Sequence, residues 1–369
     1  MTAGGDRPEL RSLLIMRPDG HTRYGGDTTL VYDTAKALRE AGVDCDVVES
    51  DNPDPRGYDI AHIFNVGQPE VAERQMDACE RANATIVLSP VWLDLKELFT
   101  RAQAAEDVIV RERSEHKAEA QLQKIRTAPL DKFFNRKQQR EFEERERRQS
   151  ALLRRARVLL PNSTVEARDC MVRLGVRDVP IISVPIPADL SPAEFWQEER
   201  WGVTCVGRVE TRKNQSSLTF ALRKESLELD LVGALYNPGL AKECERWNAR
   251  AHFHGRIARP EMLKMIGRTE VHALVSWCET AGIASLEAAA AGAKLVVGDR
   301  GAEFEYFGDD AEYADPADPD SISAAVARAL RRPPRRKGDA LDQRLRKITW
   351  DFAARETLRA YDLALSQSR

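Results

Sequence analysis

Two glutamates in the segment 271–299 have the type and spacing to bind a polar ligand. Glu279 follows an apolar run, and Glu287 lies in an alanine-rich stretch with seven residues between the two. Carboxylates accept hydrogen bonds from hydroxyl groups. Between them, residues 281–285 are predicted to begin a helix, where unpaired amides and a positive dipole end favour phosphate. The segment therefore combines a phosphate site with two acceptors for hydroxyl groups.

Two cations lie upstream, after an apolar run. Gly207-Arg208 is followed, after four residues, by Lys213-Asn214, and Glu279 comes roughly 70 residues later. Breaking a sugar–phosphate bond leaves extra negative charge on a diphosphate. Two fixed cations can neutralise that charge without a metal, and an arginine can hold two oxygens at once. Together the four residues suit a nucleotide sugar better than either pair does alone.

The elements that must position these groups alternate between strands and helices. His272–Trp277 and Leu295–Val297 are predicted strands, with a helix over 283–291 between them. The first half is predicted to have strands over 13–16, 45–48, 58–64, 85–88, 158–160 and 181–184. This alternation is typical of a doubly wound α/β sheet, where ligands bind beyond the carboxyl ends of the strands. A chain of 369 residues is long enough for two such domains.

These motifs resemble those of a known family. Glu279 and Glu287, followed by Ala-Ala-Ala-Ala-Gly, together with Gly207-Arg208 and Lys213-Asn214, resemble the signatures of the retaining GT-B glycosyltransferases of the E-x7-E family, glycosyl transferases group 1. The resemblance implies two facing Rossmann-like domains: 1–187 on the acceptor side and 188–348 for the nucleotide sugar. A C-terminal helix within 349–369 is expected to cross back to the first domain.

The resemblance also implies roles for individual residues. Arg208 and Lys213 would stabilise the leaving diphosphate, Glu279 would bind the hydroxyls of the donor sugar, and Glu287 would bind the ribose. The donor would be a UDP- or GDP-sugar, with no prosthetic group and no metal required. The other donor-binding candidates are Gly25, Gly26, Gly207, Asn214, His254, Gly255, Arg256, Thr280, Ala281, Gly282 and Ile283.

The first half supplies the acceptor-side candidates, which are His21, Tyr24, His62, Asn65, Trp92 and Asp94. Many relatives carry a histidine after the fourth strand, where this chain has Pro90, Val91 and Trp92 instead. Several candidates have a structural alternative. His62 would be a packed core residue, Trp92 would fill core instead of stacking on a sugar, and Asp94 would cap the next helix instead of accepting a proton.

The segment 95–157 is predicted to be a helical insertion in the first domain. It is highly charged, and Pro129 separates two long helices predicted over about 96–126 and 134–156. A run such as REFEERERR at 140–148 mixes both signs, which suits a solvated helix. The functional interpretation is a docking arm over 96–157 for a protein partner or an anionic membrane surface. The alternative is a solvated helical hairpin.

Bulk properties exclude several classes of protein. The net charge is −3, from 56 basic and 59 acidic residues, so no global field attracts nucleic acid. Six cysteines without a C-x2-C pair argue against a zinc site or a disulfide framework. We expect neither a signal peptide nor a membrane span. The expected location is the cytoplasm, with peripheral attachment at the inner face of the membrane left open.

The sequence thus predicts a metal-independent glycosyltransferase that acts with retention. The acceptor would be a glycan, a glycolipid or a small-molecule hydroxyl, and polysaccharide biosynthesis is the commonest setting of the family. The alternative is a catalytically weak scaffold or binding protein whose charged helical arm recruits a partner. Donor hydrolysis by the purified chain would distinguish the two, because a scaffold should show none.

Overall fold

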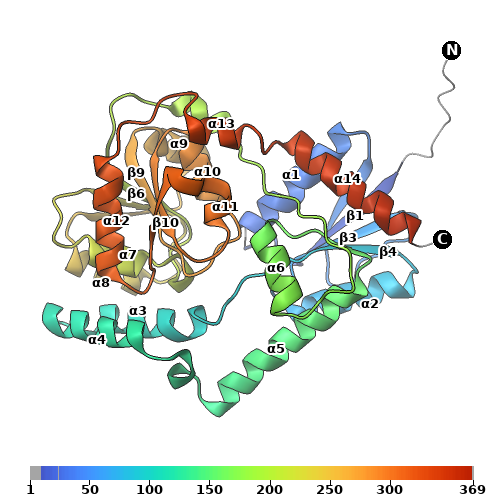
Figure 1. The fold of residues 1–369 in the computed structure, drawn as a ribbon, viewed down its shortest axis with the longest axis horizontal. Helices are drawn as coiled ribbons and strands as arrows, with labels where there is room; N and C mark the ends of the chain where they lie inside the picture. Colours follow the sequence, from blue (N-terminus) through green and yellow to red (C-terminus); the bar gives the residue numbers. More distant parts are fainter. Residues whose placement is uncertain (1–9, 24, 368–369) are drawn as a thin grey trace. The chain divides into compact units, whose positions relative to one another are not determined.

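The computed structural model describes residues 10–23 and 25–367 and divides the chain into two compact α/β units (Figure 1). The first unit contains residues 1–92, 141–187 and 348–369. The second contains residues 93–140 and 188–347. We expected the helical segment as an insertion within the first domain, whereas this division places residues 93–140 with the second unit and 141–157 with the first.

The first unit is built on a five-stranded parallel sheet of order β2-β1-β3-β4-β5. The strands are β1 (Arg11–Met16), β2 (Asp44–Glu49), β3 (Ile60–Phe64), β4 (Thr85–Ser89) and β5 (Val158–Leu159). The central strand β3 is buried along its whole length, as expected for a parallel sheet covered on both faces. The strand expected at 181–184 is only a single bridge between Leu159 and Ile181, flanked by Pro180 and Pro185, which lack the amide that a ladder needs.

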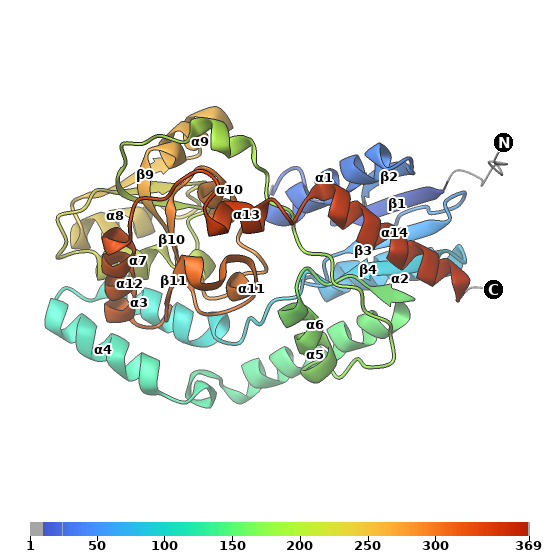
Figure 2. The same ribbon diagram turned by 45° about the horizontal axis from the view of Figure 1, so that its top comes forward.

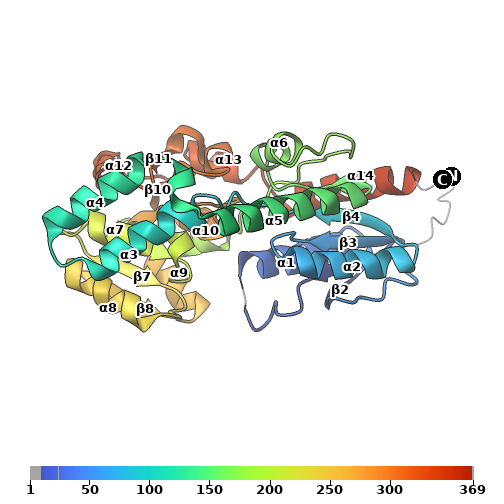
Figure 3. The same ribbon diagram turned by 90° about the horizontal axis from the view of Figure 1, so that it is seen from below.

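Helices cover both faces of this sheet. They are α1 (Gly26–Glu40), α2 (Pro69–Arg81), α5 (Arg136–Arg155), α6 (Thr164–Val172) and α14 (Trp350–Ser366); α5 belongs to this unit from residue 141 on. Side chains from α2, α5 and α6 form one core with alternate residues of β1 and β3, such as Ile15 and Ile63. Arg148 and Arg155 of α5 form ion pairs with carboxylates of α2, and Figure 3 shows both helices within this unit. The C-terminal helix α14 packs on α1 and on β4, within the first unit.

The second unit is built on a six-stranded parallel sheet of order β11-β10-β9-β6-β7-β8. Its strands are β6 (Trp201–Val206), β7 (Leu229–Val232), β8 (Ala251–Gly255), β9 (Thr269–Leu274), β10 (Lys294–Gly298) and β11 (Ala311–Ala314). Its helices are α7 (Gln215–Ala221), α8 (Pro238–Trp247), α9 (Arg259–Gly267), α10 (Ile283–Ala290), α11 (Glu303–Phe307), α12 (Pro319–Arg331) and α13 (Ala340–Leu345). Apolar side chains of α7 and α12 form one core with β6, β7 and β9.

The first expected long helix, over 96–126, is interrupted. A π-helical turn, η1 (Leu98–Ala102), leads into α3 (Gln103–Arg111), and a separate α4 (Glu115–Thr127) follows. The break occurs because Glu112 is extended and Ser114 caps α4, its Oγ accepting from the amide of Lys117 at 3.5 Å. The Ser114 side chain bonds a backbone amide and so favours a helix start over a continuous helix. The many charged residues around it gave no sign of this break. The second expected helix, 134–156, is confirmed as α5.

The α3–α4 hairpin packs on the second unit beside α7 and α8 (Figure 2). Ala105, Ile109 and Leu122 form a buried cluster with Phe220 and Trp277. The indole of Trp247 in α8 donates to the carbonyl of Ile109 at 2.7 Å. The part of the charged segment that precedes Pro129 is therefore anchored by apolar packing and is not simply a solvated hairpin.

Candidate active site

A cluster of alternating charges lies where the β6 and β9 strands end. The η4 turn (Thr211–Lys213) follows β6, and Lys213 forms an ion pair with Glu279 in the loop after β9. Arg212 contacts the same carboxylate at 3.4 Å and also pairs with Glu210 at 3.0 Å. Arg208 reaches Glu210 at 3.5 Å. The structure therefore brings Arg208, Lys213 and Glu279 together, with Arg212 between them.

Glu279 is the best buried member of this cluster, with 8% of its side chain exposed. Burial alone would raise the pKa of its carboxyl group, but the positive charges of Lys213 and Arg212 outweigh that effect and hold the pKa below its ordinary value. The carboxylate is therefore ionised at neutral pH, and it can accept hydrogen bonds from hydroxyl groups. The three cations exceed the two carboxylates Glu210 and Glu279, so the cluster retains a net positive charge for an anion.

The η4 turn, which carries Arg212 and Lys213, is fixed by backbone conformation and by one hydrogen bond. Asn214 lies between η4 and α7 with φ +59°, a left-handed conformation that asparagine tolerates, and its side chain donates to the carbonyl of Pro316 at 2.9 Å. Gly207 precedes the turn and packs against the aliphatic part of Lys213. Asn214 therefore anchors the turn that carries Lys213.

The helix expected after Glu279 is present as α10, and Gly282 is its N-cap. Gly282 has φ +60°, which a residue with a Cβ adopts only with strain, and its carbonyl accepts from Ser285 and Leu286. Ile283 is the first helical residue, so its amide has no acceptor one turn back. Thr280 is half-buried and Ala281 is buried in the loop between Glu279 and this helix.

Glu287 lies one turn into α10 and forms its ion pair outside the Lys213–Glu279 cluster. Its carboxylate contacts Arg259 of α9 at 2.7 Å, and the same guanidinium contacts Asp189 at 2.7 Å. The side chain of Glu287 is 12% exposed. The two glutamates of the sequence motif thus lie on one loop–helix unit, each next to a cation that a ligand could replace.

The three candidates at the end of β8, His254, Gly255 and Arg256, have none of these contacts in the described chain. His254 pairs with Asp230 of the neighbouring strand at 2.6 Å, and both it and Arg256 are exposed. Gly255 ends β8 with φ +65°. The structure places them at the end of the sheet on the β7–β8 side.

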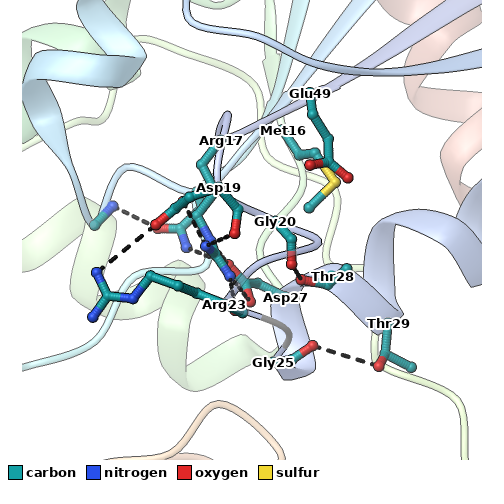
Figure 4. A network of polar contacts seen from close by, with 12 residues as sticks. Met16, Arg17, Asp19, Gly20, Arg23, Gly25, Asp27, Thr28, Thr29 and Glu49 are labelled. Atoms are coloured by element: carbon teal, nitrogen blue, oxygen red, sulfur yellow. Dashed lines mark hydrogen bonds and ion pairs between the residues drawn. The ribbon is translucent and has the colours of Figure 1, made fainter.

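In the first unit, Gly25 is the N-cap of α1 and Gly26 is its first residue. Arg17 of the preceding loop points between two carboxylates, bonding Asp19 at 2.6 Å and Asp27 at 2.7 Å (Figure 4). Burial would raise the pKa of the Asp27 carboxyl, but Arg17 holds it below its ordinary value. The loop is therefore organised around an arginine that the sequence did not single out.

Two acceptor-side candidates adjoin this loop. Asn65 follows β3 with φ +77°, and its amide reaches Asp27 at 3.4 Å. The backbone amide of His21 donates to Glu49 at 3.1 Å, and its ring is bonded to the same carboxylate. Tyr24 lies outside the described residues.

The other acceptor-side candidates have structural partners. His62 is in the core, with its ring nitrogens 2.9 Å from the hydroxyls of Tyr361 and Ser89, and burial lowers its pKa to about 3. The indole of Trp92 is buried and donates to Gln149 at 3.1 Å. Asp94 accepts from the amide of Lys96 at 3.0 Å. These placements favour the core interpretation for His62 and Trp92.

The sequence missed Arg212 and Arg259, which pair with the two motif glutamates. The signal for Arg212 was its position beside Lys213, whereas Arg259 meets Glu287 only through the tertiary fold. Among residues 10–23 and 25–367, no group of three or more His, Cys, Asp and Glu side chains is arranged to hold a metal ion. Within the same residues, no helix is both long and apolar enough to cross a bilayer.

Sucrose-phosphate synthase from Thermosynechococcus elongatus is similar over 97% of this chain and 100% of its own, with a TM-score of 0.71 and 14% identity. Anabaena HepE in complex with UDP-glucose is similar over 96% of this chain and 97% of its own, with a TM-score of 0.59 and 15% identity. The lipopolysaccharide outer core galactosyltransferase WaaB is similar over 95% of this chain and 99% of its own, with a TM-score of 0.61 and 13% identity.

Two α/β units, each built on a parallel sheet, define the GT-B glycosyltransferase fold, as predicted. Residues 188–347, which contain the charged cluster and α10, match the family described as glycosyl transferases group 1, as predicted for this half of the chain. Among curated proteins, no match to the chain was found. The fold and this family match both support a glycosyltransferase.

Proposed function

We propose that this glycosyltransferase moves a sugar from a nucleoside-diphosphate sugar to a hydroxyl acceptor, with retention of configuration and without a metal. The observation that carries the proposal is the convergence of Arg208, Arg212 and Lys213 with Glu279 beside the N-terminus of α10. A diphosphate fits this cluster because its charge would meet three cations and the first amides of a helix.

Donor binding would exchange partners within the cluster. The diphosphate would draw Lys213 away from Glu279, and the freed carboxylate would accept from hydroxyls of the sugar. The ribose would compete in the same way with Arg259 for Glu287. Each exchange replaces one charge-assisted contact by another, so no buried charge is left alone.

The chemical step would then break the bond between the anomeric carbon and the diphosphate oxygen. The acceptor oxygen would bond to that carbon on the face that the diphosphate leaves, and the proton of the acceptor would pass to the departing phosphate oxygen. The cations would act where negative charge develops, and this is the contribution that most lowers such barriers. Candidate acceptors are a glycan, a glycolipid or a small-molecule hydroxyl.

A donor screen tests this function. The full chain would be mixed in turn with UDP-, GDP- and ADP-glucose in the presence of a chelator, and both binding and slow donor hydrolysis would be measured. The proposal expects one nucleotide to bind and its sugar to be released without metal. HepE was solved with UDP and with UDP-glucose, so the uridine donor is the first to try. Binding without any hydrolysis would favour the scaffold alternative.

A further inference from the structure

Glu303, the first residue of α11, is a buried carboxyl group without a hydrogen-bond partner. Only 2% of the residue is exposed, and neither carboxyl oxygen is bonded to another residue of the described chain. A buried polar group without a partner costs free energy, so folded proteins rarely contain one without a functional reason.

The position of Gly301 shows how close Glu303 lies to the loop that carries Glu279. A Cβ atom on Gly301 would lie 2.8 Å from Oε2 of Glu303 and closer still to the backbone carbonyl of Glu279. Gly301 also has φ +101°, which favours glycine. The Glu303 carboxyl group and the backbone carbonyl of Glu279 therefore both lie close to Gly301.

The pKa values of the two carboxyl groups are shifted in opposite directions. Burial raises the pKa of Glu303 well above its ordinary value, and the negative charge of Glu279 raises it further. This shift favours the protonated form of Glu303, which has one O–H donor and one carbonyl acceptor, whereas the Glu279 carboxylate only accepts. Sugar hydroxyls both donate and accept, so the two groups are complementary to them.

We propose that Glu303 is a second sugar-binding carboxyl group beside Glu279, and that the pair selects donors whose sugar carries free hydroxyls and no acidic group. The inference rests on the proposed function, because departure of Lys213 to the diphosphate is what would open the carboxyl groups to the sugar. An acidic sugar would bring its carboxylate against the buried anion of Glu279 while the nearby cations hold the diphosphate. Such like-charge contacts exclude a competing ligand.

Calorimetric titrations test the assignment. UDP, GDP, ADP and their glucose esters would be titrated into the wild type, Glu303→Gln and Glu303→Leu. The nucleoside diphosphates should bind all three proteins alike. The additional affinity due to glucose should persist in Glu303→Gln, whose amide still donates and accepts, and fall about tenfold or more in Glu303→Leu. The exposed Glu305→Gln is the matched control and should behave as the wild type.

Two further measurements test the inference without the Glu303→Leu variant. The glucose contribution of the wild type should weaken toward alkaline pH as Glu303 loses its proton, whereas that of Glu303→Gln should not. UDP-glucuronate should bind the wild type about tenfold or more weakly than UDP-glucose. An unchanged glucose contribution in Glu303→Leu, or equal binding of the two donors, would overturn the inference alone. Failure of every nucleotide to bind the wild type would overturn the proposed function with it.

Discussion

Lys213 and Glu279, which are 66 residues apart in the sequence, form an ion pair within the second unit. The lysine comes from the turn after β6 and the glutamate from the loop after β9, and these two strands are neighbours in the sheet. The pair occupies the position where we propose that a diphosphate and a sugar bind. Each of the two charges therefore compensates the other.

Removing one of the cations should slow transfer without unfolding the protein. We expect Arg208→Ala or Lys213→Ala to lower kcat on the order of 100-fold or more, because each loses a fixed charge at the leaving diphosphate. The measurement is steady-state transfer with the donor found in the screen, with circular dichroism to monitor folding. Lys224→Ala is the control, because Lys224 is exposed and pairs with Glu115 and Glu119 away from the cluster. Normal transfer by both active-site variants would refute the assignment.

A side chain at position 301 should disturb the site through sterics. Gly301→Ala places a methyl group against the carbonyl of Glu279 and the carboxyl of Glu303, and overpacking of this kind costs roughly 1–3 kcal/mol in addition to backbone strain. Gly338→Ala is the matched control, because Gly338 also has positive φ but has no atom within 4 Å of the added methyl group. Urea unfolding should show a clearly larger loss for Gly301→Ala. Equal losses would mean that strain alone matters at both glycines.

The buried His272 should lower the stability of the folded protein in acid. Burial, and then the charge of Lys213, lower its pKa from 6.5 to about 3, and neither ring nitrogen has a partner within the described chain. Between those two values the unfolded state binds more protons, so stability falls as the pH falls, by up to about 1.4 kcal/mol per pH unit. His272→Leu should be at least as stable at neutral pH and less sensitive to acid. Parallel stability curves for the two proteins from pH 7 to pH 4 would contradict this.

The two serine caps should contribute unequally to the free energy of unfolding. Ser163 is buried and its Oγ accepts from the amide of Glu166 at 2.9 Å, whereas Ser114 accepts from Lys117 at 3.5 Å. Ser163→Ala should lower the free energy of unfolding by about 1 kcal/mol, a typical value for a cap, and Ser114→Ala should lower it by less. Chemical denaturation of both variants gives the comparison. The reverse order would show that hydrogen-bond length does not set the value of these caps.

Much of the fold could be predicted because parallel strands covered on both faces are short continuous apolar runs. Such runs at β3 and β10 are recognisable without any tertiary information. The β11 strand, Ala-Glu-Tyr-Ala, was missed because it is short and half of it is partly exposed. The break at Ser114 was missed because charged residues on both sides are good helix formers, so a local cap decided the outcome.

Only the residues of the candidate site that belong to sequence motifs could be predicted. The spacing of Arg208, Lys213, Glu279 and Glu287 indicated which side chains matter, and three of them lie in one cluster of charges. Adjacent cations look alike in a sequence, and only the η4 turn directs Arg212 toward Glu279. Glu303 has no motif at all, since its environment depends on the close approach of Gly301 to another loop.

The α3–α4 hairpin has a consequence for dissecting the protein. The family match begins at residue 188, but α3 lies well before it in the sequence and covers apolar side chains of the later segment. A fragment limited to 188–347 would expose Phe220 and Trp277 to water, and Trp247 would lose the carbonyl that its indole binds. Neither unit is one uninterrupted stretch of sequence, so this enzyme is not modular, and recombinant fragments cut at the family boundaries should aggregate.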